Sequence, residues 1–85
     1  MTFGARVKYE RERRRYSQNA LAKLVRISQA LLSKIEADKT PIPSGEIVKR
    51  LARALWVSTD YLLGMDEDDE GKHPPTGLAL AGTTA

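Results

Sequence analysis

The chain contains no cysteine, which excludes a disulfide framework and a cysteine-ligated zinc site. It also has no apolar run near the roughly 18 residues that a membrane span requires. Residues 1–15 lack the apolar core of a secretory signal. From these absences we expect a cytoplasmic protein.

Residue types that carry out catalysis are equally scarce. There is no thiol nucleophile and no glycine-rich loop of the kind that cradles phosphate, and the single histidine, His73, lies near the C-terminal end of the sequence. The acidic residues that do cluster, at 66–70, fall in a segment without helical periodicity. We therefore expect no enzymatic activity, no metal site and no cofactor.

Basic and acidic residues are divided unequally along the chain. Residues 1–65 hold 13 Lys or Arg against 6 Asp or Glu, a formal charge of +7, whereas residues 66–85 hold 1 against 5, a charge of −4. The arginines within 11–15 either form a solvated helix end or add a non-specific attraction to a polyanion. The strongly basic N-terminal part favours nucleic acid as a partner.

Apolar periodicity predicts five helices and no strand within residues 1–65. On the first helix we expect Phe3 and Val7 to face the core, and the basic residues, Arg6 included, to face solvent. The expected helices cover residues 3–14, 18–25, 29–37, 45–55 and 60–63. We predict an all-α fold, with a compact five-helix domain over 1–65 and a flexible tail over 66–85 that is acidic and then rich in Gly, Pro and Ala.

The stretch from Ser17 to Glu36 carries the clearest functional pattern, because it predicts two short amphipathic helices joined by a tight turn. Apolar positions recur at helical intervals, at Leu21, Val25, Ile27, Leu32 and Ile35. The second helix is left with one outer stripe of small or polar side chains: Gln29, Ala30, Ser33 and Lys34. A short polar stripe of this kind, next to basic residues, suits a helix that enters the DNA major groove.

Three strings, in order and at matching separations, resemble the lambda-repressor-like (Cro-like, or Xre) helix-turn-helix family. They are GARVKYER at 4–11, YSQNALAKLVRISQALLSKIE at 16–36 and LARALWVSTDYLLG at 51–64. The resemblance implies that Ser28–Ala37 is the recognition helix, with base contacts from the stripe Gln29, Ala30, Ser33 and Lys34. Gln29 would bond an adenine bidentately, Lys34 would donate to guanine, and Ala30 would touch a thymine methyl.

The same resemblance implies contacts with the DNA backbone around the recognition helix. Gln18 matches the family's glutamine at the start of the preceding helix, where the helix N-terminus also binds phosphate. The loop after the recognition helix matches at Lys39 and Thr40. The expected phosphate-binding residues are Ser17, Gln18, Arg26, Lys39, Thr40 and Arg15.

The chain departs from the family at four positions where glycine is common: Arg15, Arg26, Asp38 and Trp56. The family often needs a left-handed backbone at the turn and just after the recognition helix, at Arg26 and Asp38. Another residue in that conformation costs ~1 kcal/mol. We therefore expect either an altered turn geometry or the family's geometry held at that cost.

Other matches concern packing between the helices. Arg11 and Glu36 match a family salt bridge that joins the first and third helices. Glu10 stands where the family has an apolar residue, so we expect Tyr9 to cover the core instead. Leu31 either flanks the polar stripe or packs on the first helix.

The family pairs its subunits through the C-terminal part of the domain, where this chain has its only tryptophan. Trp56 either packs against the fifth helix or forms, with Val57, Tyr61 and Leu62, a small apolar patch for a second copy. The resemblance thus implies a homodimer on a two-fold symmetric operator, with the two recognition helices ~34 Å apart.

These patterns predict a sequence-specific, DNA-binding transcriptional regulator, and they favour a repressor. An alternative is an antitoxin-type protein that captures a protein partner through its tail and also represses its own promoter. The acidic run at 66–70 is compatible with three roles: a solubilising linker, an intramolecular competitor of DNA, or a docking segment for that partner.

Overall fold

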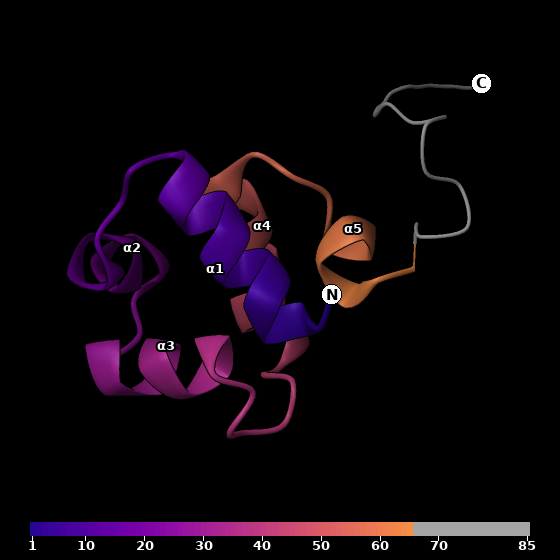
Figure 1. The fold of residues 1–85 in the computed structure, drawn as a ribbon, viewed down its shortest axis with the longest axis horizontal. Coiled ribbons are helices and arrows are strands. Elements are labelled where there is room, and N and C mark those ends of the chain that lie inside the picture. The colour runs from indigo at the N-terminus through magenta and orange to yellow at the C-terminus, as the bar shows by residue number, and fades with distance from the viewer. Residues whose placement is uncertain (66–85) are drawn as a thin grey trace.

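The computed structural model describes residues 1–65, which form five helices joined by short connections (Figure 1). The helices are α1 (Phe3–Arg13), α2 (Gln18–Val25), α3 (Gln29–Glu36), α4 (Gly45–Leu55) and α5 (Thr59–Leu63). No strand occurs within residues 1–65. The predicted all-α fold is confirmed, and each helix boundary lies within one residue of its expected position. The predicted tail, 66–85, lies outside the described residues.

Each helix begins at a hydroxyl side chain that accepts a hydrogen bond from the backbone N–H three residues later. These N-caps are Thr2, Ser17, Ser28, Ser44 and Ser58. Helices of 5 to 11 residues are marginal in isolation. The first N–H groups of a helix have no carbonyl partner within the helix. Each cap accepts a hydrogen bond from one of these groups and so helps to determine where the helix starts.

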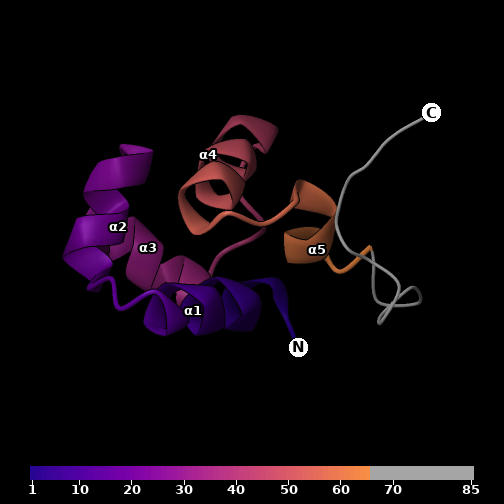
Figure 2. The same cartoon turned by 90° about the horizontal axis from the view of Figure 1, so that it is seen from above.

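The helices surround one hydrophobic core. α1 lies across the front of the molecule with α4 behind it, the α2–α3 pair occupies one end, and α5 lies at the other (Figures 1 and 2). The largest side chains with no exposed surface come from all five helices: Val7, Leu21, Val25, Leu32, Leu51, Leu55 and Leu62. No helix within residues 1–65 has the length and hydropathy to cross a membrane.

Four non-glycine residues have a left-handed backbone, with φ between 57° and 61°. They are Arg15, Arg26, Asp38 and Trp56, the same four positions at which the family commonly has glycine. Each one turns the chain out of the helix that precedes it. The domain therefore keeps the family's turn geometry and carries a cost of roughly 1 kcal/mol at each position relative to glycine.

Two expectations for α1 are wrong. Arg6 is buried rather than in solvent, and its guanidinium lies against the left-handed Gly64, where an added Cβ would be 3.1 Å from Arg6 Nη1. Tyr9 does not cover the core, because it is half exposed and Glu10 takes the buried position. Both differences arise because α5 packs against α1 and covers this side of the helix.

Glu10 is buried as a carboxylate because several groups donate to it. The Tyr61 hydroxyl donates to Oε2 at 2.9 Å, and Arg14 and Arg13 donate to Oε1 at 2.6 and 3.2 Å. Burial alone raises the pKa of Glu10, but these hydrogen bonds outweigh it and lower the pKa below 4.5. Burial and the bond to Glu10 raise the pKa of Tyr61 to about 12, so its hydroxyl stays a donor at neutral pH.

Candidate nucleic-acid interface

The recognition helix predicted from the sequence is α3, and it presents the expected stripe. The side chains of this stripe are all exposed: Gln29, Ala30, Ser33 and Lys34. The opposite face of α3 is held in the core by Leu32 and Ile35, while Leu31 is half buried and packs against the core cluster. Of the two interpretations of Leu31, the structure favours packing.

A buried ion pair joins α1 to the end of α3, as the resemblance implied. Arg11 Nε and Nη2 donate to the two carboxylate oxygens of Glu36 at 2.7 and 3.1 Å, and Nη1 donates to the Tyr16 carbonyl at 2.8 Å. The two side chains are only 11% and 3% exposed. The hydrogen bond with Glu36 raises the pKa of Arg11 above its ordinary value, so the guanidinium stays charged.

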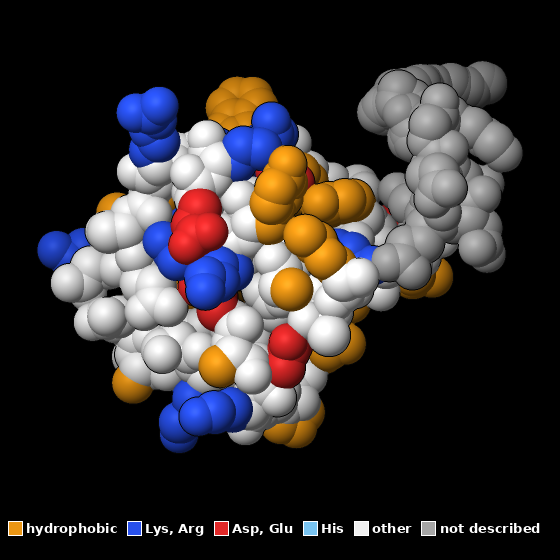
Figure 3. Space-filling model, viewed as in Figure 1, with side chains coloured by type: hydrophobic (Ala, Val, Ile, Leu, Met, Phe, Trp, Pro, Cys, Tyr) orange, Lys and Arg blue, Asp and Glu red, His pale blue; other side chains and the backbone are white. Residues whose placement is uncertain are grey.

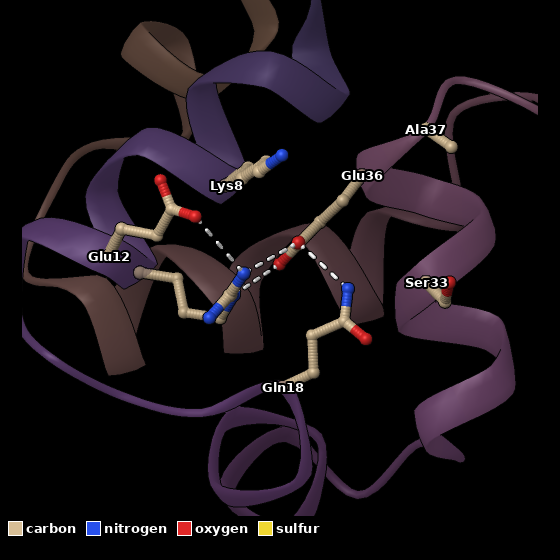
Figure 4. Close-up of a pocket in the computed structure, with 7 residues that line it drawn as sticks. Lys8, Glu12, Gln18, Ser33, Glu36 and Ala37 are labelled. Atoms are coloured by element: carbon tan, nitrogen blue, oxygen red, sulfur yellow. Dashed lines mark hydrogen bonds and ion pairs between the residues drawn. The ribbon is translucent and has the colours of Figure 1, made fainter.

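Gln18 connects this ion pair to the exposed stripe on α3. Its Nε2 donates to Glu36 Oε1 at 3.0 Å, and its Oε1 accepts a longer bond of 3.4 Å from Gln29 Nε2. Figure 4 shows Gln18 beneath Glu36 with its amide pointing at the carboxylate. The chain of contacts orients the carboxamide of Gln29, because a side chain with a fixed partner samples fewer rotamers. The sequence signalled each residue but not this connection between them.

A cleft of about 420 Å³ opens above the ion pair, between α1, α3 and the start of α2 (Figure 4). Its lining residues are Lys8, Arg11, Glu12, Gln18, Ser33, Glu36 and Ala37. Lys8 adds a cation that the predicted phosphate-binding set lacked. Its spacing of three residues from Arg11 was the available signal, because that spacing places both on one face of α1.

The predicted phosphate-binding residues do not form one cluster. Ser17 and Gln18 lie at the start of α2 beside the cleft, whereas Arg26 lies at the opposite end of that helix. Lys39 and Thr40 follow the end of α3, and Arg15 lies in the turn between α1 and α2. The Gln18 side chain is engaged by Glu36 and Gln29, and the Ala20 N–H is bonded to the Ser17 hydroxyl, so the backbone N–H groups of Gln18 and Asn19 are the candidate phosphate donors at the start of α2.

The α4–α5 corner contains the residues predicted for the dimer interface, and one of them is misassigned. Trp56 is 82% exposed, so it does not pack against α5. Val57 and Tyr61 are partly buried. Leu62 has no exposed surface, because it points into the core from α5, and it must be removed from the predicted patch. Figure 3 shows hydrophobic side chains gathered over α1 and α5. Tyr9 of α1 and Leu63 of α5 are among the exposed hydrophobic residues.

A family model described as a helix-turn-helix domain matches residues 2–64. The chain belongs to this helix-turn-helix family, in its lambda-repressor-like group. The match covers all five helices, so the α2–α3 pair and the packing around it belong to one family unit. Within the described residues, no group of three or more His, Cys, Asp or Glu is placed to hold a metal ion.

Two curated relatives extend well beyond this chain. The HTH-type transcriptional regulator DicA of Escherichia coli K12 is 31% identical over 74 residues, which is 87% of this chain and 54% of DicA. Repressor protein C2 of Salmonella phage P22 is 34% identical over 79 residues, 87% of this chain and 36% of C2. The chain thus spans about half of the first relative and about a third of the second.

Two solved structures with bound DNA have the same fold. The P22 c2 repressor in complex with a synthetic operator has a TM-score of 0.70 and 36% identity, covering 74% of this chain and 94% of that chain. SinR of Bacillus subtilis in complex with DNA has a TM-score of 0.69 and 30% identity, covering 72% and 97%.

Proposed function

We propose that this chain is a sequence-specific, DNA-binding transcriptional repressor in which α3 enters the major groove. The observation that carries this proposal is the exposed stripe on α3 whose first side chain, Gln29, is linked through Gln18 to the buried Arg11–Glu36 pair. A base-contacting group needs such support, since a loosely held side chain loses entropy when it binds. Similarity to the DNA-bound P22 c2 and SinR domains supports the same proposal.

Within the stripe, each side chain has a base feature that it fits. The Gln29 carboxamide both donates and accepts, which suits the N6 and N7 positions of adenine. Lys34 donates to guanine O6 or N7, and Ala30 offers only an apolar contact to a thymine methyl. Ser33, with one hydroxyl, hydrogen bonds with little discrimination.

The DNA backbone would be held at three places around α3. The N–H groups at the start of α2, with Ser17, take one phosphate beside the cleft, and Lys8 adds charge there. Lys39 and Thr40 bind the backbone beyond the end of α3, and Arg15 and Arg26 add attraction from the turns. If about six phosphates are neutralised, the logarithm of the affinity falls against the logarithm of salt concentration with a slope of about −5.

A homodimer formed through the α4–α5 corner completes this proposal. Trp56 exposes a large apolar surface and also holds a left-handed backbone that glycine would adopt without cost. A second copy that covers Trp56, with Val57 and Tyr61 beside it, removes that surface from water. Two copies related in this way present two α3 helices to successive major grooves of a symmetric operator.

Binding to a duplex selected from a random DNA pool, compared with a scrambled duplex, tests the base contacts. We expect the double variant Gln29→Ala, Lys34→Ala to lose most of the discrimination between the two duplexes. Lys49→Ala, which removes the same charge from an exposed position on α4, should keep it. Unchanged discrimination in the double variant would rule out these residues as base contacts.

Sedimentation of Trp56→Gly tests the dimer, because glycine suits the backbone there and leaves the core intact. We expect a smaller complex in solution and weaker, non-cooperative DNA binding. A wild-type chain and a Trp56→Gly chain with the same dimerisation constant would contradict the assignment. The antitoxin-type alternative depends on residues 66–85, outside the part of the chain that the structure describes, and stays a prediction.

A further inference from the structure

The residue that follows the recognition helix is tied to the beginning of the chain. Asp38 Oδ1 accepts a hydrogen bond from the Gly4 backbone N–H at 3.1 Å, and Oδ2 accepts one from the Thr2 hydroxyl at 2.5 Å. The partners lie 34 and 36 residues away in sequence. Thr2 is also the N-cap of α1, since its Oγ1 accepts from the Ala5 N–H at 3.1 Å.

Close approach of the two helix ends makes this contact possible. A Cβ added at Gly4 would lie 2.1 Å from the Ile35 carbonyl oxygen and 2.7 Å from Asp38 Oδ1. Any other residue at position 4 would therefore push the start of α1 away from the end of α3. The absence of a side chain at Gly4 lets the Asp38 carboxylate reach the backbone of α1.

The carboxylate also meets the favourable end of α1. The first turn of α1 contains no acidic residue, so its first N–H groups and the positive end of its dipole receive no negative charge from the helix itself. Asp38 supplies that charge from α3. Glycine, the family's common residue here, would satisfy the left-handed backbone without any tether, so the aspartate adds a connection at the expense of backbone strain.

The same turn sets the path of the chain into the loop that precedes α4. The Asp38 N–H donates to the Ile35 carbonyl at 3.1 Å, and the Lys39 N–H donates to the Lys34 carbonyl at 2.9 Å. Lys34 is the last side chain of the exposed stripe on α3, and Lys39 is the first proposed contact with the DNA backbone beyond it. Both are therefore within one hydrogen-bonded turn of the tethered residue.

The geometry points to Asp38 as a positioning residue for DNA binding: its carboxylate fastens the end of the recognition helix to α1, so that Lys39 and Thr40 meet the DNA backbone in one conformation. This inference rests on the proposed DNA-binding function. Asp38 itself, a carboxylate, makes no contact with phosphate. Its action is to reduce the conformational freedom that the loop would otherwise lose on binding.

Two variants of equal charge isolate the tether. Asp38→Asn keeps an oxygen that accepts from the Gly4 N–H and an amide that can donate to Thr2, and asparagine tolerates the left-handed backbone. Asp38→Gly keeps the backbone conformation and removes the tether. We expect the full 85-residue chain with Asp38→Gly to bind its selected duplex roughly three- to tenfold more weakly than Asp38→Asn, the range of one hydrogen bond.

A general loss of stability is separated from positioning by two further measurements on the same pair. We expect similar melting temperatures for the two variants, because glycine relieves backbone strain while it removes two hydrogen bonds, one exposed and one partly buried. We also expect that replacing one backbone phosphate of the duplex by a neutral methylphosphonate lowers the affinity of Asp38→Asn more than it lowers the affinity of Asp38→Gly. Equal affinities and equal methylphosphonate profiles for the two variants would overturn the inference while leaving the proposed function intact.

Hydrogen exchange tests the tether without DNA. The Lys39 N–H, which donates to Lys34, should exchange faster in Asp38→Gly than in Asp38→Asn, and equal rates would overturn the claim that the carboxylate orders this turn. If the wild-type chain selects no duplex at all, the proposed function fails, and the DNA-positioning role of Asp38 fails with it.

Discussion

Two buried glutamates connect α1 to different helices, Glu36 to α3 and Glu10 to α5, and their partners differ. Glu36, on α3, pairs with a buried arginine and also accepts a hydrogen bond from Gln18, which contacts the exposed stripe of α3 at Gln29. Glu10, on α1, receives bonds from Tyr61 of α5 and from arginines that are 22% and 56% exposed. Equal burial of a carboxylate therefore says little about its role, because the burial and connections of its partners decide the energetic cost of removing it.

The largest effect is expected from Glu36→Ala. Removing this carboxylate takes away both hydrogen bonds to Glu36 and leaves the buried Arg11 guanidinium with the Tyr16 carbonyl and the exposed Glu12 as its remaining partners, which costs about 3 kcal/mol of unfolding free energy. Urea unfolding measures it, with Glu12→Ala as the control. Glu12 is 58% exposed and lies 3.8 Å from the same arginine, so its removal should cost under about 1 kcal/mol. Equal losses for the two variants would contradict the account.

A smaller effect is expected at the other glutamate. Glu10→Gln weakens the bonds from the exposed Arg13 and the partly exposed Arg14, whose guanidinium groups can turn toward water, and we expect a loss of about 1–2 kcal/mol of unfolding free energy. The double variant Glu10→Leu, Tyr61→Phe removes both the carboxylate and the hydroxyl that depends on it, and should be close to wild type in urea unfolding. A double variant less stable than Glu10→Gln would show that the polar cluster is worth more than an apolar contact.

A still smaller effect is expected in the acid dependence of the melting temperature, to which Glu10 and its hydrogen-bond donors contribute. The folded pKa of Glu10 lies below its ordinary value of 4.5, so the folded state binds fewer protons than the unfolded state in this range. The contribution of Glu10 to the free energy of unfolding is complete above its pKa in the unfolded chain, and it is lost as the pH falls through its pKa in the folded protein. Melting temperatures between pH ~5 and ~2 should thus fall less in Glu10→Leu, Tyr61→Phe than in the wild type. A steeper fall of the melting temperature in the double variant would show that Glu10 does not stabilise the folded protein by staying ionised.

Local patterns were sufficient for most of the fold and for the exposed stripe. The helices could be placed from apolar spacing, which is a property of a few neighbouring residues. The Arg11–Glu36 pair and the left-handed positions at Arg26 and Asp38 followed from the family resemblance. In each case the determinant is a short segment or a shared family feature.

The features that the sequence did not reveal depend on which helices meet. Glu10 and Arg6 are buried only because α5 packs over α1, and Leu62 belongs to the core for the same reason. The link from Gln18 to Gln29 and the tether at Asp38 join residues that are 11 and more positions apart. No local pattern encodes the distance between such side chains.

We expect Glu36 to serve DNA recognition and Glu10 to serve stability alone. The most direct test is the ratio of affinities for a selected and a scrambled duplex, measured for Glu36→Gln and Glu10→Gln at a temperature where both variants are fully folded. We expect a ratio about tenfold lower for Glu36→Gln than for the wild type, equivalent to about 1.4 kcal/mol, and an unchanged ratio for Glu10→Gln. Equal ratios in the two variants would show that Glu36 has no part in recognition beyond that of any buried carboxylate.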